Sequence, residues 1–169
     1  MSKLKILTYP DNKLRRPTDE LEDIDGEVQK MIDQMAVTMY DAPGVGLAAI
    51  QVGWNKSVLI YDISPEEQDR SLHVLINPRI VDQQGEMLSE NEGCLSVPEF
   101  RADVKRYSSI RVEGVDREGR PVKLEAEGML AIVLQHEIDH LKGKLFIDHV
   151  SALKRQMYTR RMKKKLRSK

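Results

Sequence analysis

The chain has 169 residues, and its 27 Lys and Arg residues balance 27 Asp and Glu residues, so its formal net charge is zero. This length suits a single domain over residues 1–169 with a substantial core, and the apolar runs are too short to cross a bilayer. Residues 1–7 lack the apolar core and the cleavage site of a signal peptide, and one Cys cannot form an internal disulfide. We therefore expect a cytoplasmic protein without a membrane partner.

The first predicted element is a helix over residues 25–40. Apolar side chains recur there at helical spacing, and Asp25 precedes them as a candidate N-cap. The run Ala-Pro-Gly-Val-Gly at residues 42–46 then ends this helix in a tight turn that depends on glycine. The spaced apolar positions are Val28, Met31, Ile32, Met35 and Met39.

Short β-rich runs follow the turn. Residues 57–61 and 73–76 are predicted strands, the second closed by Asn77-Pro78, and another strand begins at residues 80–82. Residues 109–115 alternate between apolar and polar side chains, and residues 121–126 return as their hairpin partner across a turn. Since strands and helices are segregated along the chain, we predict an α+β fold with small antiparallel sheets.

The next predicted helix carries the most specific motif, His-Glu-Ile-Asp-His at residues 136–140. It follows an apolar run at residues 129–134, and Gly143 stands where a helix is expected to end. Residues four apart share one helix face, so the two imidazoles can bind one metal ion and Glu137 can reach a water on that ion. This H-E-x-x-H pattern indicates metal-assisted hydrolysis but does not name the reaction. We expect the small sheets to pack around this central helix.

A catalytic site of this kind needs a third protein ligand. The zinc-protease extension H-E-x-x-H-x-x-G-x-x-H fails, because Phe146 stands at its last position, and no acidic residue follows Asp148 to act as a downstream ligand. Asp148 and His149 remain nearby candidates. A lone Cys is most often a small buried side chain, but beside an incomplete pair of His ligands we favour Cys94. A thiolate and two imidazoles would leave one open position on the metal.

The last predicted helix begins near Ser151 and belongs to a basic C-terminal segment at about 151–169. Residues 154–169 contain nine basic and no acidic residues, and residues 1–153 hold the other 18 basic residues against 27 acidic ones, a net charge of −9. Such a segment is typical of a solvated helix face, and the alternative is a contact with the phosphates of a nucleic acid. The predicted apolar side of this helix holds Ala152, Leu153, Met157, Tyr158 and Met162.

Three separated stretches of the chain carry motifs in a fixed order. They read Gly-Val-Gly-Leu-Ala-Ala-Ile-Gln at residues 44–51, Glu-Gly-Cys-Leu-Ser at residues 92–96 and Gln-His-Glu-Ile-Asp-His at residues 135–140. These stretches resemble the signature motifs of the peptide deformylase family, and the likeness extends from Leu7 to about Ser151. The resemblance implies an enzyme that removes the N-formyl group from the formyl-methionine of newly made proteins and releases formate.

The same resemblance implies the parts of a metal centre. Cys94, His136 and His140 would bind one divalent ion, expected to be Fe²⁺ in the native form, with Zn²⁺, Ni²⁺ or Co²⁺ as substitutes. The metal would lower the pKa of a bound water that attacks the formyl carbon. Glu137 would take a proton from that water as general base and return it to the departing amine as general acid.

Further roles follow from the resemblance for the residues around this centre. The Gln51 side chain and the backbone N–H of Leu95 would donate to the oxyanion that forms on attack. Gly46 would let the backbone come close to the substrate. The alternative for Gln51 is that its side chain ties down its own loop.

The resemblance also implies where the substrate lies. An apolar slot for the methionine would be lined by Val45, Met129, Ile132 and Val133, although apolar helix residues of this kind belong to a core in any interpretation. Arg101 matches a position that touches the substrate backbone in the family, and the alternative is a solvated arginine. The partners implied are N-formyl-methionyl nascent polypeptides and, through the basic C-terminal segment, ribosomal RNA. No DNA partner is expected.

Two other functions stay open from the sequence. A general metallopeptidase would use the same helix, although its usual third ligand is missing. A ribosome- or RNA-binding module would use a structural metal closed by four protein ligands, with His149 as the candidate fourth.

Overall fold

The computed structural model describes residues 2–168, and its strands form two antiparallel sheets. The larger sheet has the strand order β1-β2-β3-β6-β7, and the smaller one pairs β4 with β5. The strands are β1 (Gly46–Ala48), β2 (Val58–Tyr61), β3 (His73–Gln84), β4 (Met87–Cys94), β5 (Val97–Arg106), β6 (Ser109–Val115) and β7 (Pro121–Glu127). Every strand pair is antiparallel and the longer helices flank the strands in sequence, so the predicted α+β class is confirmed.

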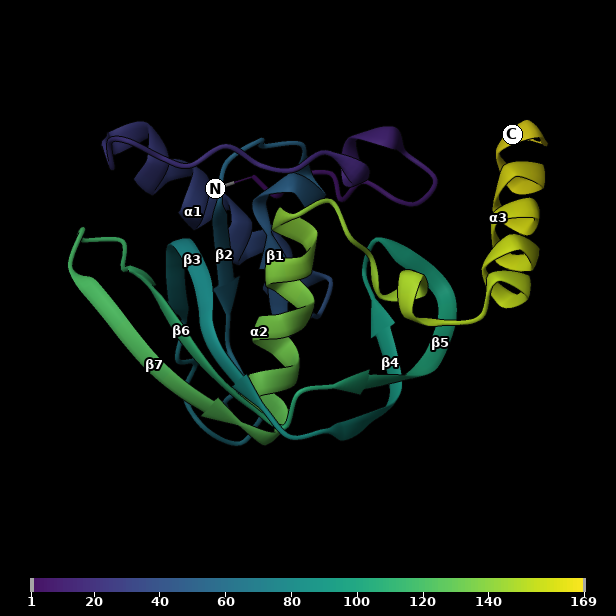
Figure 1. Ribbon diagram of the computed structural model, residues 1–169. Coiled ribbons are helices and arrows are strands. Elements are labelled where there is room, and N and C mark those ends of the chain that lie inside the picture. The colour runs from purple at the N-terminus through teal and green to yellow at the C-terminus, as the bar shows by residue number, and fades with distance from the viewer. Residues whose placement is uncertain (1, 169) are drawn as a thin grey trace.

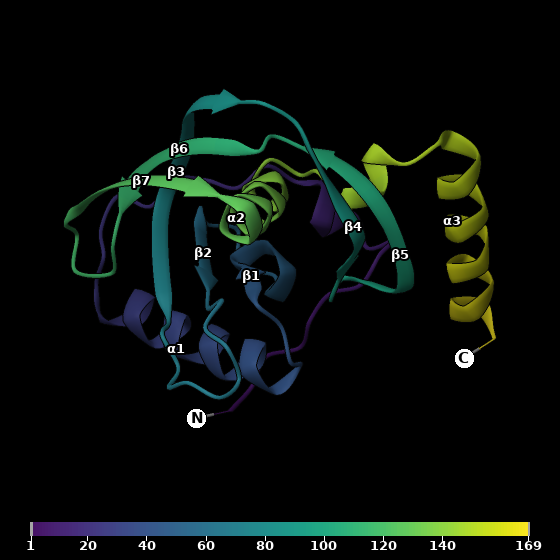
Figure 2. The same ribbon diagram turned by 90° about the horizontal axis from the view of Figure 1, so that it is seen from below.

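One helix lies at the centre of these strands (Figure 1). Figure 2 looks nearly along α2 and shows strands of both sheets around it, with α1 beyond β1 and β2 and with α3 outside β5. The helices are α1 (Gly26–Asp41), α2 (Gly128–Leu141) and α3 (Ala152–Arg167), with short 3₁₀ turns η1 (Asn12–Arg15), η2 (Ala49–Val52) and η3 (Phe146–His149). Within residues 2–168, no helix combines the length and the apolar character that a membrane crossing requires.

The larger sheet lies between two helices, and β2 shows how its side chains divide between them. All four residues of β2 are buried. Leu59 packs in the cluster that includes Leu134 of α2, while Ile60 packs in the cluster that includes Ile32 of α1. Successive side chains of a strand point to opposite faces, so a wholly apolar strand is what a sheet covered on both faces needs.

Helix α1 begins and packs as its sequence predicts. The Asp25 carboxylate accepts a hydrogen bond from the Val28 N–H at 3.0 Å, which makes Asp25 the predicted N-cap. Val28, Ile32, Met35 and Met39 are all buried on the face toward the sheet.

Helix α2 ends at the predicted glycine. Gly143 has φ +78°, and a Cβ there would lie 2.4 Å from the carbonyl oxygen of Arg15, so both conformation and space require glycine. The backbone N–H of Thr18 donates to the carbonyl of Leu141 at 2.9 Å. The N-terminal segment therefore passes directly against the end of the central helix.

The prediction that Asn77-Pro78 closes a strand was wrong. Strand β3 continues through this pair, with a register shift in which two β3 residues face one residue of β6. Pro78 cannot donate to the ladder, so the strand bulges there instead of ending. Gly114 leaves room for the bulge, because a Cβ there would meet the Ile76 carbonyl oxygen at 2.9 Å, and the Asn77 amide bonds both backbone groups of Leu21.

The hairpin of β4 and β5 was not predicted. Residues 90–93 read Glu-Asn-Glu-Gly, which has no strand alternation and resembles a loop. A register shift lies in this run, because Ser89 pairs with Val104 and Glu92 pairs with Ala102, so two β4 residues face one residue of β5. Asn91 has φ 54° at this bulge, and its N–H donates to the Asp103 carboxylate at 2.9 Å.

Helix α3 begins at the predicted place, with the Ser151 hydroxyl accepting from the Lys154 N–H at 3.2 Å. Tyr158 and Met162 are buried against the cluster around Phe146. Ala152, Leu153 and Met157, predicted on the apolar side, are exposed, Leu153 by 66% and Met157 by 61%. That part of the prediction was wrong, because α3 touches the rest of the protein along a narrow strip. Lys169, the last residue of the predicted basic segment, lies outside the described residues.

Candidate metal centre and active site

Three metal-binding atoms meet where β4 ends beside α2. The Cys94 Sγ lies 3.3 Å from the His140 Nε2, which lies 3.3 Å from the His136 Nε2. His136 and His140 are four residues apart on α2 and are 9% and 0% exposed. Among residues 2–168, this trio is the one group of His, Cys and acidic side chains close enough to share an ion.

The donor set fits a divalent metal ion. With metal–nitrogen bonds of about 2.0–2.1 Å and tetrahedral angles, two ligand nitrogens stand roughly 3.3 Å apart. The Nε2 atoms of His136 and His140 have this separation. A thiolate and two imidazoles suit Fe²⁺, Zn²⁺, Co²⁺ and Ni²⁺ alike, so the donor atoms do not distinguish among these ions.

A buried network behind His136 orients its ring. The Glu92 carboxylate lies 2.7 Å from the His136 Nδ1, so Nδ1 carries the proton and Nε2 keeps its lone pair for a metal. Arg106, 5% exposed, donates to both Glu92 oxygens and, at 3.0 Å, to the Asp139 carboxylate. Burial opposes ionisation of Glu92, but hydrogen bonds from His136 and Arg106 outweigh it and lower the pKa of Glu92 to about 2.

Glu137 is also a buried carboxyl, but its pKa is raised where that of Glu92 is lowered. It is 5% exposed, and its Oε1 has no hydrogen-bond partner among the described residues. Burial raises the pKa of Glu137 to about 7. Gly46 lies against it, because a Cβ at residue 46 would stand 2.6 Å from the Glu137 Oε2. The close approach that requires this glycine is therefore toward Glu137.

Gln51 joins the first motif to the second. Its Oε1 accepts from the Ala48 N–H at 2.8 Å, which fixes the amide orientation. Its Nε2 donates to the Ser96 hydroxyl at 3.0 Å and makes a longer contact of 3.7 Å with the Cys94 sulfur. An NH₂ group has two donors, so one hydrogen is committed to Ser96 and the other points toward the metal-binding atoms.

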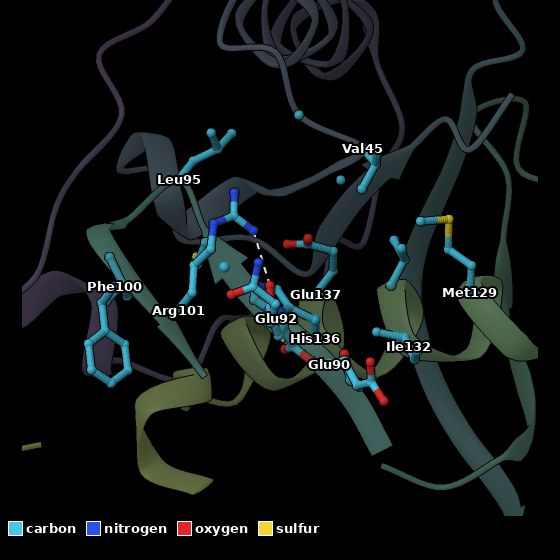
Figure 3. A pocket seen from close by; sticks show the side chains of 18 of the residues that line it. Val45, Glu90, Glu92, Leu95, Phe100, Arg101, Met129, Ile132, His136 and Glu137 are labelled. Atoms are coloured by element: carbon cyan, nitrogen blue, oxygen red, sulfur yellow. Dashed lines mark hydrogen bonds and ion pairs between the residues drawn. The ribbon is translucent and has the colours of Figure 1, made fainter. Parts of the chain in front are cut away.

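A cavity of about 1090 Å³ opens in front of these groups (Figure 3). Val45 and Met129 stand at its mouth with 47% and 60% of their surface exposed. Glu137 and His136 are among its inner residues, and Arg101 donates to the Asn91 carbonyl at 3.1 Å. Every predicted site residue except His140 lines this cavity: Val45, Gly46, Gln51, Cys94, Leu95, Arg101, Met129, Ile132, Val133, His136 and Glu137.

The two other candidate ligands do not reach the metal-binding atoms. Asp148 forms a 2.6 Å ion pair with Arg15 and accepts from the Leu145 N–H at 3.0 Å. The His149 Nε2 lies 3.3 Å from the Asp139 carboxylate, and this His is absent from the trio around Cys94. The expectation that His149 could close a four-ligand structural site is therefore wrong.

Similarity to known proteins identifies the family. The model of the polypeptide deformylase family matches residues 3–156. The chain belongs to the peptide deformylase family. It is therefore a hydrolase, and the family acts on formylated nascent peptides.

Relatives in this family match the chain over nearly its whole length. A peptide deformylase of Desulfosudis oleivorans is 52% identical over 167 residues, which cover 99% of this chain and 96% of that protein. The crystal structure of a peptide deformylase from Legionella pneumophila matches with 44% identity and a TM-score of 0.89, covering 98% of this chain and 96% of that one. A class I type b peptide deformylase from Acinetobacter baumannii, crystallised with Met-Ala-Ser bound, matches with 30% identity and a TM-score of 0.82, covering 88% and 98% of the two chains.

Sequence reasoning missed the residues behind the metal-binding atoms. Glu92 and Ser96 lie inside the Glu-Gly-Cys-Leu-Ser motif, and Asp139 lies inside the H-E-x-x-H motif. Their positions within these motifs could have identified them as neighbours of the metal ligands. Arg106 had no such signal. Its role depends on β5 passing beside α2, which no local pattern of residues predicts.

Proposed function

We propose that this chain removes the N-formyl group from the formyl-methionine of nascent polypeptides and releases formate, acting as one domain over residues 1–169. The observation that carries the proposal is the meeting of the Cys94 sulfur and two imidazole nitrogens near Glu137, whose Oε1 has no hydrogen-bond partner among residues 2–168. Family membership supports the substrate class. A nascent-chain substrate also supports the expected location in the cytoplasm, where proteins are made.

Cys94, His136 and His140 would hold one divalent ion, with Fe²⁺ expected and Zn²⁺, Ni²⁺ or Co²⁺ as substitutes. A divalent ion supplies Lewis-acid chemistry there, since it lowers the pKa of water and polarises a carbonyl group. Arg106 and Glu92 contribute by holding the His136 ring with Nε2 toward the ion.

Glu137 would move the proton of the reaction. It accepts a proton as water adds to the formyl carbon, and it delivers that proton to the amine nitrogen as the carbon–nitrogen bond breaks. One oxygen of Glu137 has no hydrogen-bond partner among residues 2–168, so it is free for this role. The backbone at Gly46 leaves space for the carboxyl and holds it close to the reacting atoms.

Gln51 and Leu95 would stabilise the oxyanion. The Gln51 amide contacts Cys94, and the backbone N–H of Leu95 follows Cys94 directly in the chain. Both are neutral donors, and neutral donors fixed in place stabilise developing negative charge. Ser96 contributes by holding the Gln51 amide, which does not need to reorganise during the reaction.

The cavity walls would select the acyl group and the first residue. The formyl carbon bears only hydrogen, so a cramped site around it would exclude an acetyl group, and the close approach of Gly46 to Glu137 is consistent with such a site. Val45, Met129, Ile132 and Val133 would form the apolar slot for the methionine side chain, and Arg101 would contact the peptide backbone.

Formate release from formyl-Met-Ala-Ser tests the function, with acetyl-Met-Ala-Ser as the matched control. Protein purified without oxygen should release formate and leave the acetyl peptide intact. Removal of the metal with a chelator should abolish formate release, and elemental analysis of the active protein should identify the ion. Equal cleavage of both peptides, or cleavage at internal bonds, would favour a general metallopeptidase instead.

The expected oxidation chemistry tests the choice of metal. A ferrous ion beside a thiolate is open to oxidation, so activity of the iron form should decay in air and persist longer with Ni²⁺ or Zn²⁺. Air-stable activity with iron bound would contradict the Fe²⁺ assignment.

The basic segment at 151–169 is proposed to contact ribosomal RNA. Its Lys and Arg side chains lie mostly on the exposed surface of α3, and contacts with phosphate weaken as salt rises. Co-sedimentation with ribosomes at low and high salt should lose its salt dependence when residues 154–169 are deleted. Equal binding by the truncated chain would contradict the proposal.

A further inference from the structure

One buried carboxylate has no part in the chemistry above. Among residues 2–168 the buried acidic side chains are Asp62, Glu92 and Glu137, and Asp62 is the one that does not line the cavity. It is 7% exposed and follows directly after β2. A carboxylate with so little access to water needs hydrogen bonds to stay charged, so its donors indicate what it holds in place.

Four donors surround the Asp62 carboxylate. Its Oδ1 accepts from the backbone N–H of Ser64 at 2.9 Å and from the Ser64 hydroxyl at 2.5 Å. Its Oδ2 accepts from the Ser71 N–H at 2.9 Å and from the Tyr40 hydroxyl at 2.6 Å. Three of these donors belong to the loop that joins β2 to β3, and the fourth belongs to the last turn of α1. Asp62 therefore ties this loop to the end of α1.

The same loop also contacts the ring of Tyr40. The guanidinium carbon of Arg70 lies 4.1 Å from the ring centroid, a distance at which a cation is attracted to the face of an aromatic ring. Tyr40 is thus held at its ring by Arg70 and at its hydroxyl by Asp62. Both contacts join the loop between β2 and β3 to α1.

The end of α1 and the end of β2 both hold one wall of the cavity. Residues 43–46 line the cavity and follow α1 closely in the chain. The Gly44 N–H donates to the Met39 carbonyl at 2.8 Å, which fixes the start of this wall to α1. The backbone N–H of Asp62 donates to the Val45 carbonyl at 2.9 Å, which fixes its other end to β2.

The hydrogen bond between Tyr40 and Asp62 joins these two anchors and closes a ring of contacts around the wall. Two neighbouring residues of the wall depend on this ring to different degrees. Gly46 belongs to β1 and pairs with Tyr61, so the sheet holds it as well. Val45 precedes the strand, and its side chain is 47% exposed at the mouth of the cavity. A displacement of Asp62 would therefore move Val45 more than Gly46.

We propose that Asp62, bonded to Tyr40, positions the cavity wall at residues 43–45 and thereby determines how strongly the site prefers methionine as the first residue. The inference rests on the proposed deformylase function and assigns part of its selectivity to a side chain outside the cavity. Asp62 touches no substrate, so it is a positioning residue. Because Val45 belongs to the proposed methionine slot and Gly46 lies against Glu137, loss of Asp62 should raise KM and leave kcat nearly unchanged.

Asp62→Asn tests the proposal. An amide has one acceptor oxygen where a carboxylate has two, so Asn cannot accept from the donors on both sides. For formyl-Met-Ala-Ser we expect KM to rise about five- to tenfold and kcat to stay within about twofold of wild type. For formyl-Ala-Ala-Ser, whose first side chain is too short to fill the slot, kcat/KM should change by less than about twofold. The Met-to-Ala ratio of kcat/KM should therefore fall.

Tyr40→Phe is the second variant. It removes the one donor that α1 contributes and keeps the ring beneath Arg70 and the three donors from the loop. This variant should fold even where Asp62→Asn does not, because the carboxylate remains bonded on both oxygens. Its KM for formyl-Met-Ala-Ser should rise about threefold to fivefold, with the same fall in the Met-to-Ala ratio.

Asp116→Asn is the matched control. Asp116 also holds a turn, since its carboxylate accepts from the N–H groups of Glu118 and Arg120, each at 2.9 Å. This turn lies between β6 and β7, and Asp116 does not line the cavity. Its substitution should lower the unfolding midpoint and keep the wild-type Met-to-Ala ratio. A wild-type ratio in both Asp62→Asn and Tyr40→Phe, or an equal fall in Asp116→Asn, would overturn the inference.

A failure of the enzyme function is distinguishable from a failure of this inference. No formate from either peptide with wild-type protein would contradict the proposed function, whereas formate release with unchanged selectivity in the variants would contradict only the role of Asp62. Calorimetric binding of Met-Ala-Ser and Ala-Ala-Ser examines the slot without turnover. Asp62→Asn should bind Met-Ala-Ser about five- to tenfold more weakly than wild type and Ala-Ala-Ser equally well. An equal loss of affinity for both peptides would indicate a general structural defect and overturn the inference.

Discussion

Helices α2 and α3 have similar lengths, 14 and 16 residues, but nine side chains of α2 are buried and two of α3 are. The buried set of α2 includes His136, Glu137 and His140, so its polar groups act in surroundings from which water is largely excluded. Most charges of α3 face solvent, and among its described side chains only Tyr158 and Met162 are buried. The difference predicts that substitutions around α2 alter catalysis or the fold strongly, while those at α3 have small effects on stability and none on the reaction.

Glu137→Gln should have the largest effect, because it removes the group proposed to transfer the proton. We expect kcat for formyl-Met-Ala-Ser to fall by about 10²- to 10⁴-fold. Metal content and the unfolding midpoint should stay close to wild type, since the amide has the same shape. Normal turnover by this variant would refute the role of Glu137.

Arg106→Met should come next, because it leaves Glu92 and Asp139 as partly or fully buried carboxylates without their cation. Breaking a buried ion pair from one side costs about 3–5 kcal/mol in the free energy of unfolding. Metal affinity should fall by about 10- to 100-fold, because the orientation of His136 depends on this network.

Arg111→Met is the matched control for Arg106. Its pair with Glu125 is 3.1 Å long, but the two side chains are 51% and 77% exposed. Loss of this exposed pair should cost under about 1 kcal/mol. Urea unfolding and metal titration of both variants measure the difference, and equal destabilisation would show that burial of the α2 network contributes nothing.

Gly46→Ala tests the close approach of β1 to α2. The added methyl group would stand 2.6 Å from the Glu137 Oε2, so the carboxyl must move. A displacement of this size lowers kcat by about 10- to 100-fold. Gly26→Ala is the control, since a Cβ there meets no atom within 4 Å, and it should retain activity.

Tyr158→Phe tests the attachment of α3. The Tyr158 hydroxyl donates to the Pro98 carbonyl at 2.6 Å, so its loss should lower the free energy of unfolding by about 1 kcal/mol. Tyr107→Phe, at an exposed ring, should leave stability unchanged. kcat should match wild type in both variants, and a fall confined to Tyr158→Phe would show that α3 supports the site.

Lys165→Gln should have the smallest effect. The Lys165 ammonium lowers the pKa of Glu99, so the pair contributes stability above the pKa that Glu99 has in the unfolded chain, and this contribution is lost as pH falls through the lowered value. The variant should therefore unfold slightly earlier than wild type at pH 7, and the two should converge in acid or in 1 M salt. A difference that persists under both conditions would exclude this ion pair as its cause.

Helices and regular hairpins could be predicted because each repeats a pattern. Asp25 with the spaced Met35 and Met39 located α1, and alternation located β6 and β7. Strand β4 could not be predicted, because its bulge at Glu90 and Asn91 removes the alternation that marks a strand. The full length of β3 could not be predicted for the same reason, since its bulge lies at Asn77-Pro78.

The residues of the candidate site likewise fall into those that the sequence predicts and those that it does not. Residues within short motifs, such as His136 and Cys94, could be assigned because the chemistry needs those atoms at those spacings. Arg106 could not be assigned, because its partners Glu92 and Asp139 come from β4 and α2 and reach the end of β5 only in the folded chain. The exposure of Glu90 at the cavity could not be predicted either, since it depends on a local change of register in β4.

The contact between the N-terminal segment and the end of α2 spans most of the chain. Thr18 and Leu141, joined by hydrogen bonds, are 123 residues apart. Closing so long a loop costs entropy, so we expect this contact to form after the strands between its two partners have paired. The N-terminal segment thus lies against the C-terminal end of the helix that presents both His residues, so residues 15–18 support the active site without any atom in it.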